Sequence, residues 1–429
     1  MVEGRTPNFI VILADDLGYG DLGCDGGGII RTPNLDRMAE EGVRLTDFYA
    51  SANVCTPSRA GLLTGAYAIR HGLAHEVIQP SDDIGLPPGA FTIPRGLGPG
   101  YAKALFGKWH LGHVPPHWPP TLFGFDVFHG LPYSHDMRPI AMWDAGGGEA
   151  ERIEGRVDFA RLTADLFTRA LAFAADHRSS PFFVLLALTA PHTPLLPNPD
   201  AESGSPAGAY GEVVEEIDLN VGRLFSSLAE MGVDEQTLVV FTSDNGPWFE
   251  GSSGPFRDRK GGSGWDGGFR VPFIARRPGV IPPGQVSGAL ASNLDLLPTL
   301  LAMAGAEMPS KTPIDGRDIS GVLTRLEPSP HEEIILFDNA KVAAVRTARW
   351  KWVERAYYRR LDIDLGGYGY PLLFDLSIDP GETYSVIRRH PEIARQMQHR
   401  ADRARAQYEP LAAAFPAYLA PPGAERHPD

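Results

Sequence analysis

The sequence has few cysteines, no long apolar run and no excess of basic residues. Its 429 residues include two cysteines, which excludes the disulfide framework of small secreted proteins. No apolar run reaches the roughly 20 residues that a membrane-spanning helix needs. The formal net charge of -14 argues against a nucleic-acid surface and against a basic membrane-binding face. An anionic substrate is still compatible with this balance, because a local cluster of cations sets the charge inside a cleft.

The first residues, MVEGRTPNFIVILADD, do not resemble a secretory leader. Their apolar run is short, lacks a cleavage site and leads into acidic residues. We therefore expect a cytoplasmic protein with no membrane partner and no nucleic-acid partner. If a leader has been removed from a longer precursor, the expected location is instead periplasmic or secreted.

Short apolar runs alternate with amphipathic patterns through most of the chain. Three runs have the composition of strands buried on both faces: 9–14, 181–189 and 237–242. Three helical patterns lie between them: 34–41, 157–177 and 210–231. This alternation predicts an α/β domain with a mostly parallel mixed β-sheet flanked by helices. Ligands of such sheets bind at the carboxyl ends of the strands.

The pattern changes after about residue 326. Four short strand-like segments are followed by a helical pattern at 391–408; the segments are 334–337, 343–346, 350–354 and 372–376. Short strands close together in sequence predict a small C-terminal α+β domain with an antiparallel sheet. We therefore divide the chain into a large catalytic domain, 1–325, and a C-terminal subdomain, 326–429, made of an antiparallel sheet plus a helix.

Carboxylates follow two of the predicted buried strands. Asp15 and Asp16 are adjacent at the end of the first strand, and Asp244 and Asn245 follow the third. Adjacent carboxylates repel one another unless a cation neutralises them. Three carboxylates and an amide form an all-oxygen set that suits a hard cation such as Ca²⁺ or Mg²⁺. The alternative is that each pair caps a helix or forms a turn, which is the commoner role of one such pair.

Five candidate cationic or imidazole residues lie in turn, glycine-rich or strand-end segments: Arg59, Lys108, His110, His192 and Lys260. Lys108 and His110 are two residues apart, so in an extended segment both side chains point to the same face. A lone lysine or arginine is usually a solvated surface charge, and a lone histidine is more often structural than catalytic. Composition alone does not bring these five together.

The two cysteines have different surroundings. Cys55 lies in NVCTPSRAGLLTG, where its residue type alone is compatible with a thiol nucleophile, a metal ligand or a buried space-filling side chain. We expect residues 60–65 of this stretch to begin a helix that holds position 55 at the metal. Cys24, in DLGCDG, is interpreted as a small, half-buried structural thiol behind the first strand.

An ordered set of motifs resembles the Cys-type, formylglycine-dependent sulfatases of the alkaline phosphatase superfamily, which include the arylsulfatases. The signature is CTPSRAGLLTG at 55–65. The supporting motifs are ADDLGYGDLG at 14–23, TPNLDRMAEEG at 32–42, GKWHLG at 107–112, PHTP at 191–194, SDNG at 243–246, GGFRVPFIARRPG at 267–279 and NLDLLPTL at 293–300. FDLSIDPGE at 374–382 resembles a closing segment of the same family. The resemblance implies the alkaline phosphatase-like fold.

The resemblance also implies a modified residue and a metal. In similar enzymes a formylglycine-generating enzyme oxidises the signature cysteine, here Cys55, to Cα-formylglycine, whose aldehyde hydrate is the nucleophile. One divalent cation is implied, usually Ca²⁺, with Mg²⁺ or Mn²⁺ possible. By position its ligands are Asp15, Asp16, Asp244, Asn245 and a hydrate oxygen of residue 55.

The remaining candidates take their implied roles from the same motifs. Arg59, Lys108 and His110 match residues that hold and activate the hydrate. His192 and Lys260 match residues that contact the sulfate and protonate the leaving oxygen. In this scheme metal and lysines neutralise the charge that develops on the sulfate oxygens. The second hydrate hydroxyl then loses a proton to His110 and expels sulfate, so that one hard hydrolysis becomes two easier steps.

Two segments depart from the family pattern. Lys260 lies six residues before Asp266 in RKGGSGWDGG, where the family usually has a spacing of five to a glutamate. One extra residue in this loop leaves open whether Lys260 occupies the family position. Upstream of GKWHLG, the segment 92–100 reads TIPRGLGPG in place of a helical stretch. Its prolines and glycines predict a local loop.

These observations predict hydrolysis of a small sulfate ester, aryl or sugar, to an alcohol or phenol and inorganic sulfate. A phosphonate monoester or phosphodiester hydrolase that uses the same formylglycine site is the alternative, and a non-catalytic metal-binding protein is a remoter one. Aromatic residues in the loops 112–148 and 246–258 either contact the substrate or pack the loops onto the domain. The natural substrate, metal identity and oligomeric state are not determined by the sequence.

Overall fold

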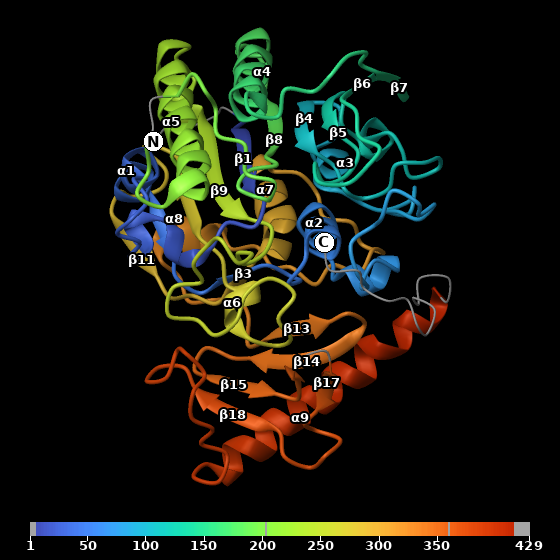
Figure 1. Ribbon diagram of the computed structural model, residues 1–429, viewed down its shortest axis with the longest axis vertical. Helices are drawn as coiled ribbons and strands as arrows, with labels where there is room; N and C mark the ends of the chain where they lie inside the picture. The colour runs from blue at the N-terminus through green and yellow to red at the C-terminus, as the bar shows by residue number, and fades with distance from the viewer. Residues whose placement is uncertain (1–5, 202–203, 359–360, 416–429) are drawn as a thin grey trace.

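A ten-stranded central sheet organises the large part of the molecule (Figure 1), in a computed structural model that describes residues 6–201, 204–358 and 361–415. Its strands are β1 (Asn8–Ala14), β2 (Val43–Leu45), β4 (Ala102–Lys108), β5 (Val127–Leu131), β6 (Trp143–Gly146), β7 (Glu149–Arg152), β8 (Phe182–Ala187), β9 (Thr237–Ser243), β10 (Phe273–Arg276) and β11 (Gln285–Ser287). The order across the sheet is β11-β2-β10-β9-β1-β8-β4-β5-β6-β7.

The middle of this sheet is parallel. Strands β9, β1, β8, β4 and β5 pair in parallel, while β10 and β6 join the flanks in antiparallel fashion. All residues of β1, β8 and β9 are buried, which agrees with their continuous apolar sequences. The mostly parallel mixed sheet predicted from the sequence is therefore confirmed, and its carboxyl edge collects the residues that follow these strands.

Helices cover both faces of the sheet. They are α1 (Pro33–Glu40), α2 (Cys55–Thr64), α3 (Ile93–Leu97), α4 (Leu162–Asp176), α5 (Gly208–Glu230), α6 (Asp266–Phe269), α7 (Leu296–Ala304) and α8 (Ser320–Arg325). Alternate residues of β1 divide between the two cores: Phe9, Val11 and Leu13 pack with α2, α3, α7 and α8, whereas Ile10 and Ile12 pack with α1, α4 and α5. No helix of the described residues is both long and apolar enough to cross a membrane.

A second, four-stranded antiparallel sheet follows in the chain. It consists of β13 (Ile334–Asp338), β14 (Lys341–Arg346), β15 (Trp350–Val353) and β18 (Leu372–Asp375). Helix α9 (Pro391–Tyr408) covers one face, and the opposite face packs on residues of the large part that include Trp265 and Phe269. Figure 1 shows this sheet between α9 and α6. The predicted C-terminal antiparallel sheet and helix are confirmed.

The remaining strands form small pairs: β3 (Phe48–Tyr49) with β12 (Ala291–Ser292), and β16 (Arg355–Tyr358) with β17 (Leu361–Asp364). The loop expected at 92–100 is partly wrong, because residues 93–97 form the short helix α3. Its proline, Pro94, lies in the first turn, where no backbone N–H is needed, and the Thr92 side chain caps the helix by accepting from the Arg95 N–H.

Gly107 has a backbone conformation that leaves no room for a side chain. It lies in β4 with φ at +114°, and a Cβ at this position would lie 1.8 Å from the carbonyl oxygen of Ala187 in β8. No other residue type fits this approach, because a side chain would overlap that carbonyl. The glycine before Lys108 therefore fixes the position of this lysine at the carboxyl edge.

Candidate active site

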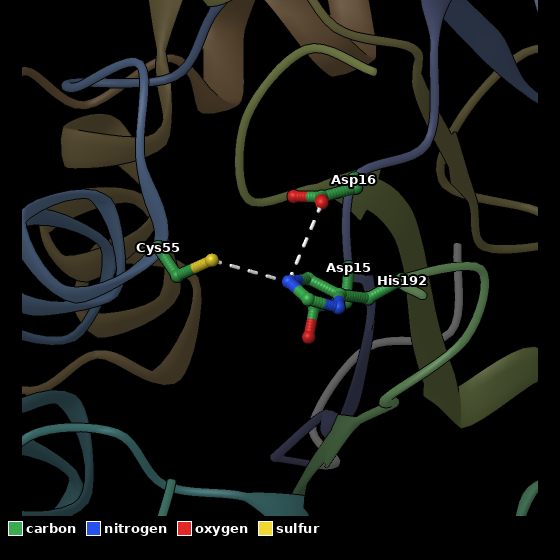
Figure 2. A group of neighbouring side chains, drawn as sticks. All are labelled: Asp15, Asp16, Cys55 and His192. Carbon is green, nitrogen blue, oxygen red and sulfur yellow. Dashed lines mark hydrogen bonds and ion pairs between the residues drawn. The ribbon is translucent and has the colours of Figure 1, made fainter. Parts of the chain in front are cut away.

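The predicted site residues converge at the carboxyl edge of the central sheet. Asp15 and Asp16 follow β1, Asp244 follows β9, and Lys108 ends β4. The ligand atoms of Asp15, Asp16, Cys55 and His192 all lie within 4.8 Å of one another. Figure 2 shows the side chains of Asp16, Cys55 and His192 directed toward a common space. Residues as far apart in sequence as Asp16 and Lys260, 244 positions, thus meet in one cluster.

Cys55 is the first residue of α2, so the helix begins five residues earlier than the sequence analysis expected. The helix can start here because Val54 is extended and the Ser58 N–H already bonds to the Val54 carbonyl. The thiol is 1% exposed and its Sγ lies 3.5 Å from Asp15 Oδ1. Burial raises the pKa of the thiol well above its ordinary value. An unmodified Cys55 is therefore a neutral and poorly reactive thiol.

Arg59 also lies within α2, not in a turn as predicted. Its Nε donates to Asp244 Oδ2 at 2.8 Å, and its NH1 group donates to the Lys108 carbonyl at 2.9 Å. The remaining guanidinium nitrogen lies 3.5 Å from Asp15 and has no hydrogen-bond partner among the described residues. Arg59 therefore ties helix α2 to β4 and β9 and keeps one donor directed at the carboxylates.

Each site lysine pairs with one of the adjacent aspartates. Lys108 Nζ donates to Asp15 Oδ2 at 2.7 Å, and Lys260 Nζ donates to Asp16 Oδ2 at 2.7 Å. Burial disfavours the Asp15 carboxylate, but Lys108 and then Arg59 outweigh burial and hold its pKa well below the usual range. Burial likewise works against the Lys260 ammonium, while Asp16 raises its pKa above the ordinary value. Despite the extra loop residue, Lys260 lies in the cluster.

His110 does not follow the extended geometry predicted for it. Its φ is +58°, so the alternation of a strand does not relate its side chain to that of Lys108. Its Nε2 lies 3.0 Å from the Ile78 carbonyl, which requires a proton on Nε2. Burial first, and then the charge of Lys108, lowers its pKa well below the usual range. His110 is thus neutral, and its buried Nδ1 lone pair has no hydrogen-bond partner among the residues that the structure describes.

His192 has the opposite tautomer. Its Nδ1 lies 2.6 Å from the Thr193 carbonyl and must carry a proton, which leaves Nε2 as the atom that faces the cluster. Nε2 lies 3.6 Å from Asp16 Oδ2. The two histidines therefore present different ring nitrogens, Nδ1 in His110 and Nε2 in His192. They can take part in proton transfer at different points of a reaction.

The oxygen atoms at this edge fit a hard cation. Asn245 Oδ1 is fully buried and has no hydrogen-bond partner within the described part of the chain, although its Nδ2 donates to Asp16 Oδ1 at 2.7 Å. A buried carbonyl oxygen without a donor is costly unless a cation occupies its free side. Burial and the charge of Asp15 also raise the pKa of Asp244 to about 6. The donor set of three carboxylates and one amide thus favours Ca²⁺ or Mg²⁺ over a thiophilic metal.

The group of mutually close ligand atoms in the structure differs from the predicted set of metal ligands. His192 joins Asp15, Asp16 and Cys55 in the group of mutually close ligand atoms, and Asp244 does not belong to that group. Asp244 Oδ2 instead accepts from Arg59, and its Oδ1 accepts from the Asp16 N–H at 3.2 Å.

Two further polar residues lie near this edge that the sequence analysis did not select as site residues. Ser134 and His135 follow β5, and Ser134 Oγ and His135 Nδ1 are buried atoms for which the described residues provide no hydrogen-bond partner. The His135 ring lies 5.7 Å from the ring of His192. Polar residues directly after a buried strand were the available signal, since the same pattern identified the aspartates.

The loop that carries Lys260 rests on the small sheet. Ser263 Oγ donates to the Arg355 carbonyl at 2.7 Å. Lys351 of β15, which is fully buried, pairs with Asp266 at 2.6 Å and with Glu382 at 2.8 Å. The Asp266 N–H also donates to Glu382 Oε2 at 2.8 Å. Strand β16 thus holds Ser263, and Lys351 of β15 holds Asp266, in the segment that follows Lys260.

Most loop aromatic residues pack the loops onto the domain. Five of them are buried: Trp118, Phe123, Phe125, Tyr133 and His135. Trp248 and Phe249 differ, because they remain exposed on the loop between β9 and α6. Cys24 is half-buried beside the core that contains α1, in agreement with a structural role.

Comparison with known proteins agrees with this geometry. The sulfatase family matches residues 7–306, and the C-terminal region of N-sulphoglucosamine sulphohydrolase matches residues 263–407. Human arylsulfatase A is 38% identical, over 90% of this chain and 84% of its own. Mouse steryl-sulfatase is 34% identical, over 97% and 84%. The crystal structure of the PsFucS1 sulfatase from Pseudoalteromonas sp. superposes with a TM-score of 0.86 at 30% identity, covering 96% of this chain and 92% of that one. The chain therefore belongs to the sulfatase family.

Proposed function

We propose that this protein hydrolyses sulfate esters, taking an ester R–O–SO₃⁻ and water to the alcohol or phenol R–OH and inorganic sulfate. The observation that carries the proposal is the arrangement around Cys55: Lys108 and Lys260 face it, and oxygen ligands for a hard cation lie beside it. Buried cations in an otherwise acidic protein supply the local positive charge that an anionic ester needs.

Two groups complete the site in this proposal: Cα-formylglycine at position 55, produced by a formylglycine-generating enzyme, and one divalent cation. Asp15, Asp16, Asp244 and Asn245 would hold the cation, most simply Ca²⁺. Together these groups supply a hydrate hydroxyl whose lowered pKa makes it nucleophilic near neutral pH.

The protein's own residues bind the sulfate and move protons. The Lys108 and Lys260 ammonium groups each have donors beyond their single aspartate bond, and these donors neutralise the sulfate oxygens as negative charge develops. To act as the proton donor, His192 would be protonated on both ring nitrogens: Nδ1–H stays bonded to the Thr193 carbonyl, and the Nε2 proton would pass to the oxygen of the departing alcohol or phenol. The Nδ1 of His110, which has no hydrogen-bond partner among the described residues, would accept a proton from a hydroxyl on residue 55.

The test is sulfate release by protein made together with a formylglycine-generating enzyme. Intact mass spectrometry first verifies that the thiol at position 55 has been replaced by an aldehyde. We expect the converted protein to release sulfate from 4-nitrophenyl sulfate, and Cys55→Ala to release none. Cys24→Ala is the matched control and should retain wild-type activity, because Cys24 lies outside the cluster.

Two results would overturn the proposal. One is a Cys55 that keeps its sulfur in a fully active enzyme. The other is a kcat/KM more than about tenfold higher on a phenyl phosphonate or a bis-aryl phosphate than on the aryl sulfate, which would favour a phosphonate or phosphodiester hydrolase.

A further inference from the structure

Trp248 and Phe249 form an exposed aromatic pair at the rim of the site. The two side chains are 40% and 68% exposed, and their rings meet edge to face with centroids 4.6 Å apart. Large aromatic side chains normally bury their rings, so adjacent exposed rings at a site rim suggest a surface that a ligand covers. We refer to these two residues as the aromatic pair.

The aromatic pair lies beside Lys260. The Lys260 ammonium lies 6.0 Å from the centroid of the Trp248 ring and at the same time bonds to Asp16 within the cluster. A sulfate bound by Lys260 therefore lies close enough to Trp248 for an attached group to reach the aromatic pair. The leaving group of a sulfate ester is attached directly to that sulfate, so it is the part of the substrate that can reach the rings.

The backbone holds the aromatic pair in position. The Lys260 N–H donates to the Pro247 carbonyl at 3.0 Å, and Arg259 donates to the Trp248 carbonyl at 3.3 Å. The Arg259 guanidinium also lies 5.1 Å from the centroid of the Phe249 ring. Such a preorganised surface loses little freedom when a ligand binds to it.

The charge around the rings suits a leaving group that gains negative charge. Breaking the S–O bond places negative charge on the leaving oxygen, and the cations Arg259 and Lys260 both lie next to the rings. The free ring surface itself offers apolar contact and ring stacking, with few hydrogen-bonding atoms for the several hydroxyl groups of a sugar.

We propose that Trp248 and Phe249 form a subsite that binds an aromatic ring in the leaving group of the substrate. This inference rests on the proposed sulfatase function and deepens it by assigning the substrate class. The two residues determine specificity; bond breaking itself depends on the cluster around Cys55.

The test compares three sulfates of primary alcohols, whose leaving oxygens have similar basicity: 2-phenylethyl sulfate, ethyl sulfate and glucose 6-sulfate. We expect the converted wild-type enzyme to prefer 2-phenylethyl sulfate over ethyl sulfate in kcat/KM. Trp248→Ala should reduce this ratio about tenfold, which corresponds to the roughly 1.4 kcal/mol of one good ring contact. Phe249→Ala should reduce it about threefold because its ring is the more exposed one.

Tyr384→Ala is the matched control, since Tyr384 is 75% exposed on the C-terminal part of the chain, and it should leave the ratio unchanged. If Trp248→Ala lowers kcat/KM equally for all three esters, the ring acts only by supporting Lys260 and the proposed subsite is wrong. A selective loss on glucose 6-sulfate would identify a sugar as the occupant and refute an aromatic one. If the converted wild-type enzyme releases sulfate from none of them and none from 4-nitrophenyl sulfate, the proposed function itself fails and the subsite with it.

Discussion

Replacing Lys351 by methionine tests whether buried charge joins the small sheet to the Lys260 loop. Lys351 is fully buried between Asp266 and Glu382, at 2.6 and 2.8 Å. Asp266 keeps further partners in the variant, because Tyr49 donates to it at 2.8 Å and Arg270 lies 3.5 Å away. Among the described residues, the Glu382 carboxylate keeps the Asp266 N–H as its one hydrogen-bond donor. The substitution therefore leaves one buried carboxylate almost uncompensated.

The expected loss is large. Removing one partner of a buried ion pair costs about 3–5 kcal/mol. At about 2.1 cal/mol/K per residue, the unfolding entropy of the 429-residue chain is about 0.9 kcal/mol/K, so this cost lowers Tm by about 3–6 °C. Differential scanning calorimetry at several pH values measures the change.

The loss should also depend on pH. In the wild-type protein, burial raises the pKa of Glu382 to about 7, above its ordinary value of 4.5, while Lys351 partly offsets that effect. A carboxyl group with a raised pKa stabilises the fold when protonated, and this stability is lost as pH rises through the folded pKa. Without Lys351 that pKa rises further. The Tm deficit of Lys351→Met should thus be small near pH 5 and largest near pH 8.

Two further variants test whether an unpaired buried charge causes the loss of stability. Lys341→Met, on neighbouring β14, removes an exposed pair with Glu409 and should lower Tm by less than about 1 °C. Adding Glu382→Gln to Lys351→Met removes the stranded charge and should recover part of the loss at pH 8. A Lys351→Met deficit below about 1 °C at pH 8, or an equal deficit at pH 5 and pH 8, would contradict the charge-based account.

Three other predictions concern the site and the strands that hold it. His192→Ala should lower kcat about 10²–10⁴-fold on sulfates of poorly acidic alcohols and less on 4-nitrophenyl sulfate, which needs little protonation; equal losses on both would argue against a proton donor. Asn245→Ala should raise at least about tenfold the Ca²⁺ concentration that restores half-maximal activity after chelation, and an unchanged titration would exclude this oxygen as a ligand. Gly107→Ala should destabilise the fold by about 3 kcal/mol or more, measured by thermal unfolding, because its Cβ would overlap the Ala187 carbonyl; a wild-type Tm would show that β4 can move away.

The sequence predicted those elements whose local signal is strong. The apolar runs at 9–14, 181–189 and 237–242 became β1, β8 and β9 with ends shifted by a few residues, and 391–408 became α9 with the predicted ends. Strands of two to four residues at the sheet flanks were not predicted. Their pairing depends on neighbours distant in sequence, and so short a run carries no periodic pattern.

The sequence predicted which residues form the candidate site, but it did not predict their backbone conformations. The motifs identified Cys55, Arg59 and Lys260, and all three lie at the cluster. Neither the start of α2 at Cys55 nor the positive φ of His110 could be derived locally, because tertiary contacts fix both. The buried ion pair of Lys351 was not predicted, for a related reason. Its partner Asp266 is 85 residues away in the sequence. A lysine in a short strand is expected to be a surface charge when only the sequence is known.

The pairing of acids and bases at the sheet edge has a consequence for the catalytic cycle. Formal charges there balance between three carboxylates and three cations: Asp15, Asp16, Asp244, Arg59, Lys108 and Lys260. Because these side chains balance, a divalent cation bound alone would give the buried site a net charge of about +2. A dianion bound alone would give it a net charge of about -2. Each should therefore strengthen the binding of the other, and by thermodynamic linkage the coupling is reciprocal. Inorganic sulfate is a dianion and matches a divalent cation better than the monoanionic ester does. With a divalent cation in place, the product would bind more tightly than the substrate, and we expect its departure, rather than bond cleavage, to limit turnover on reactive esters.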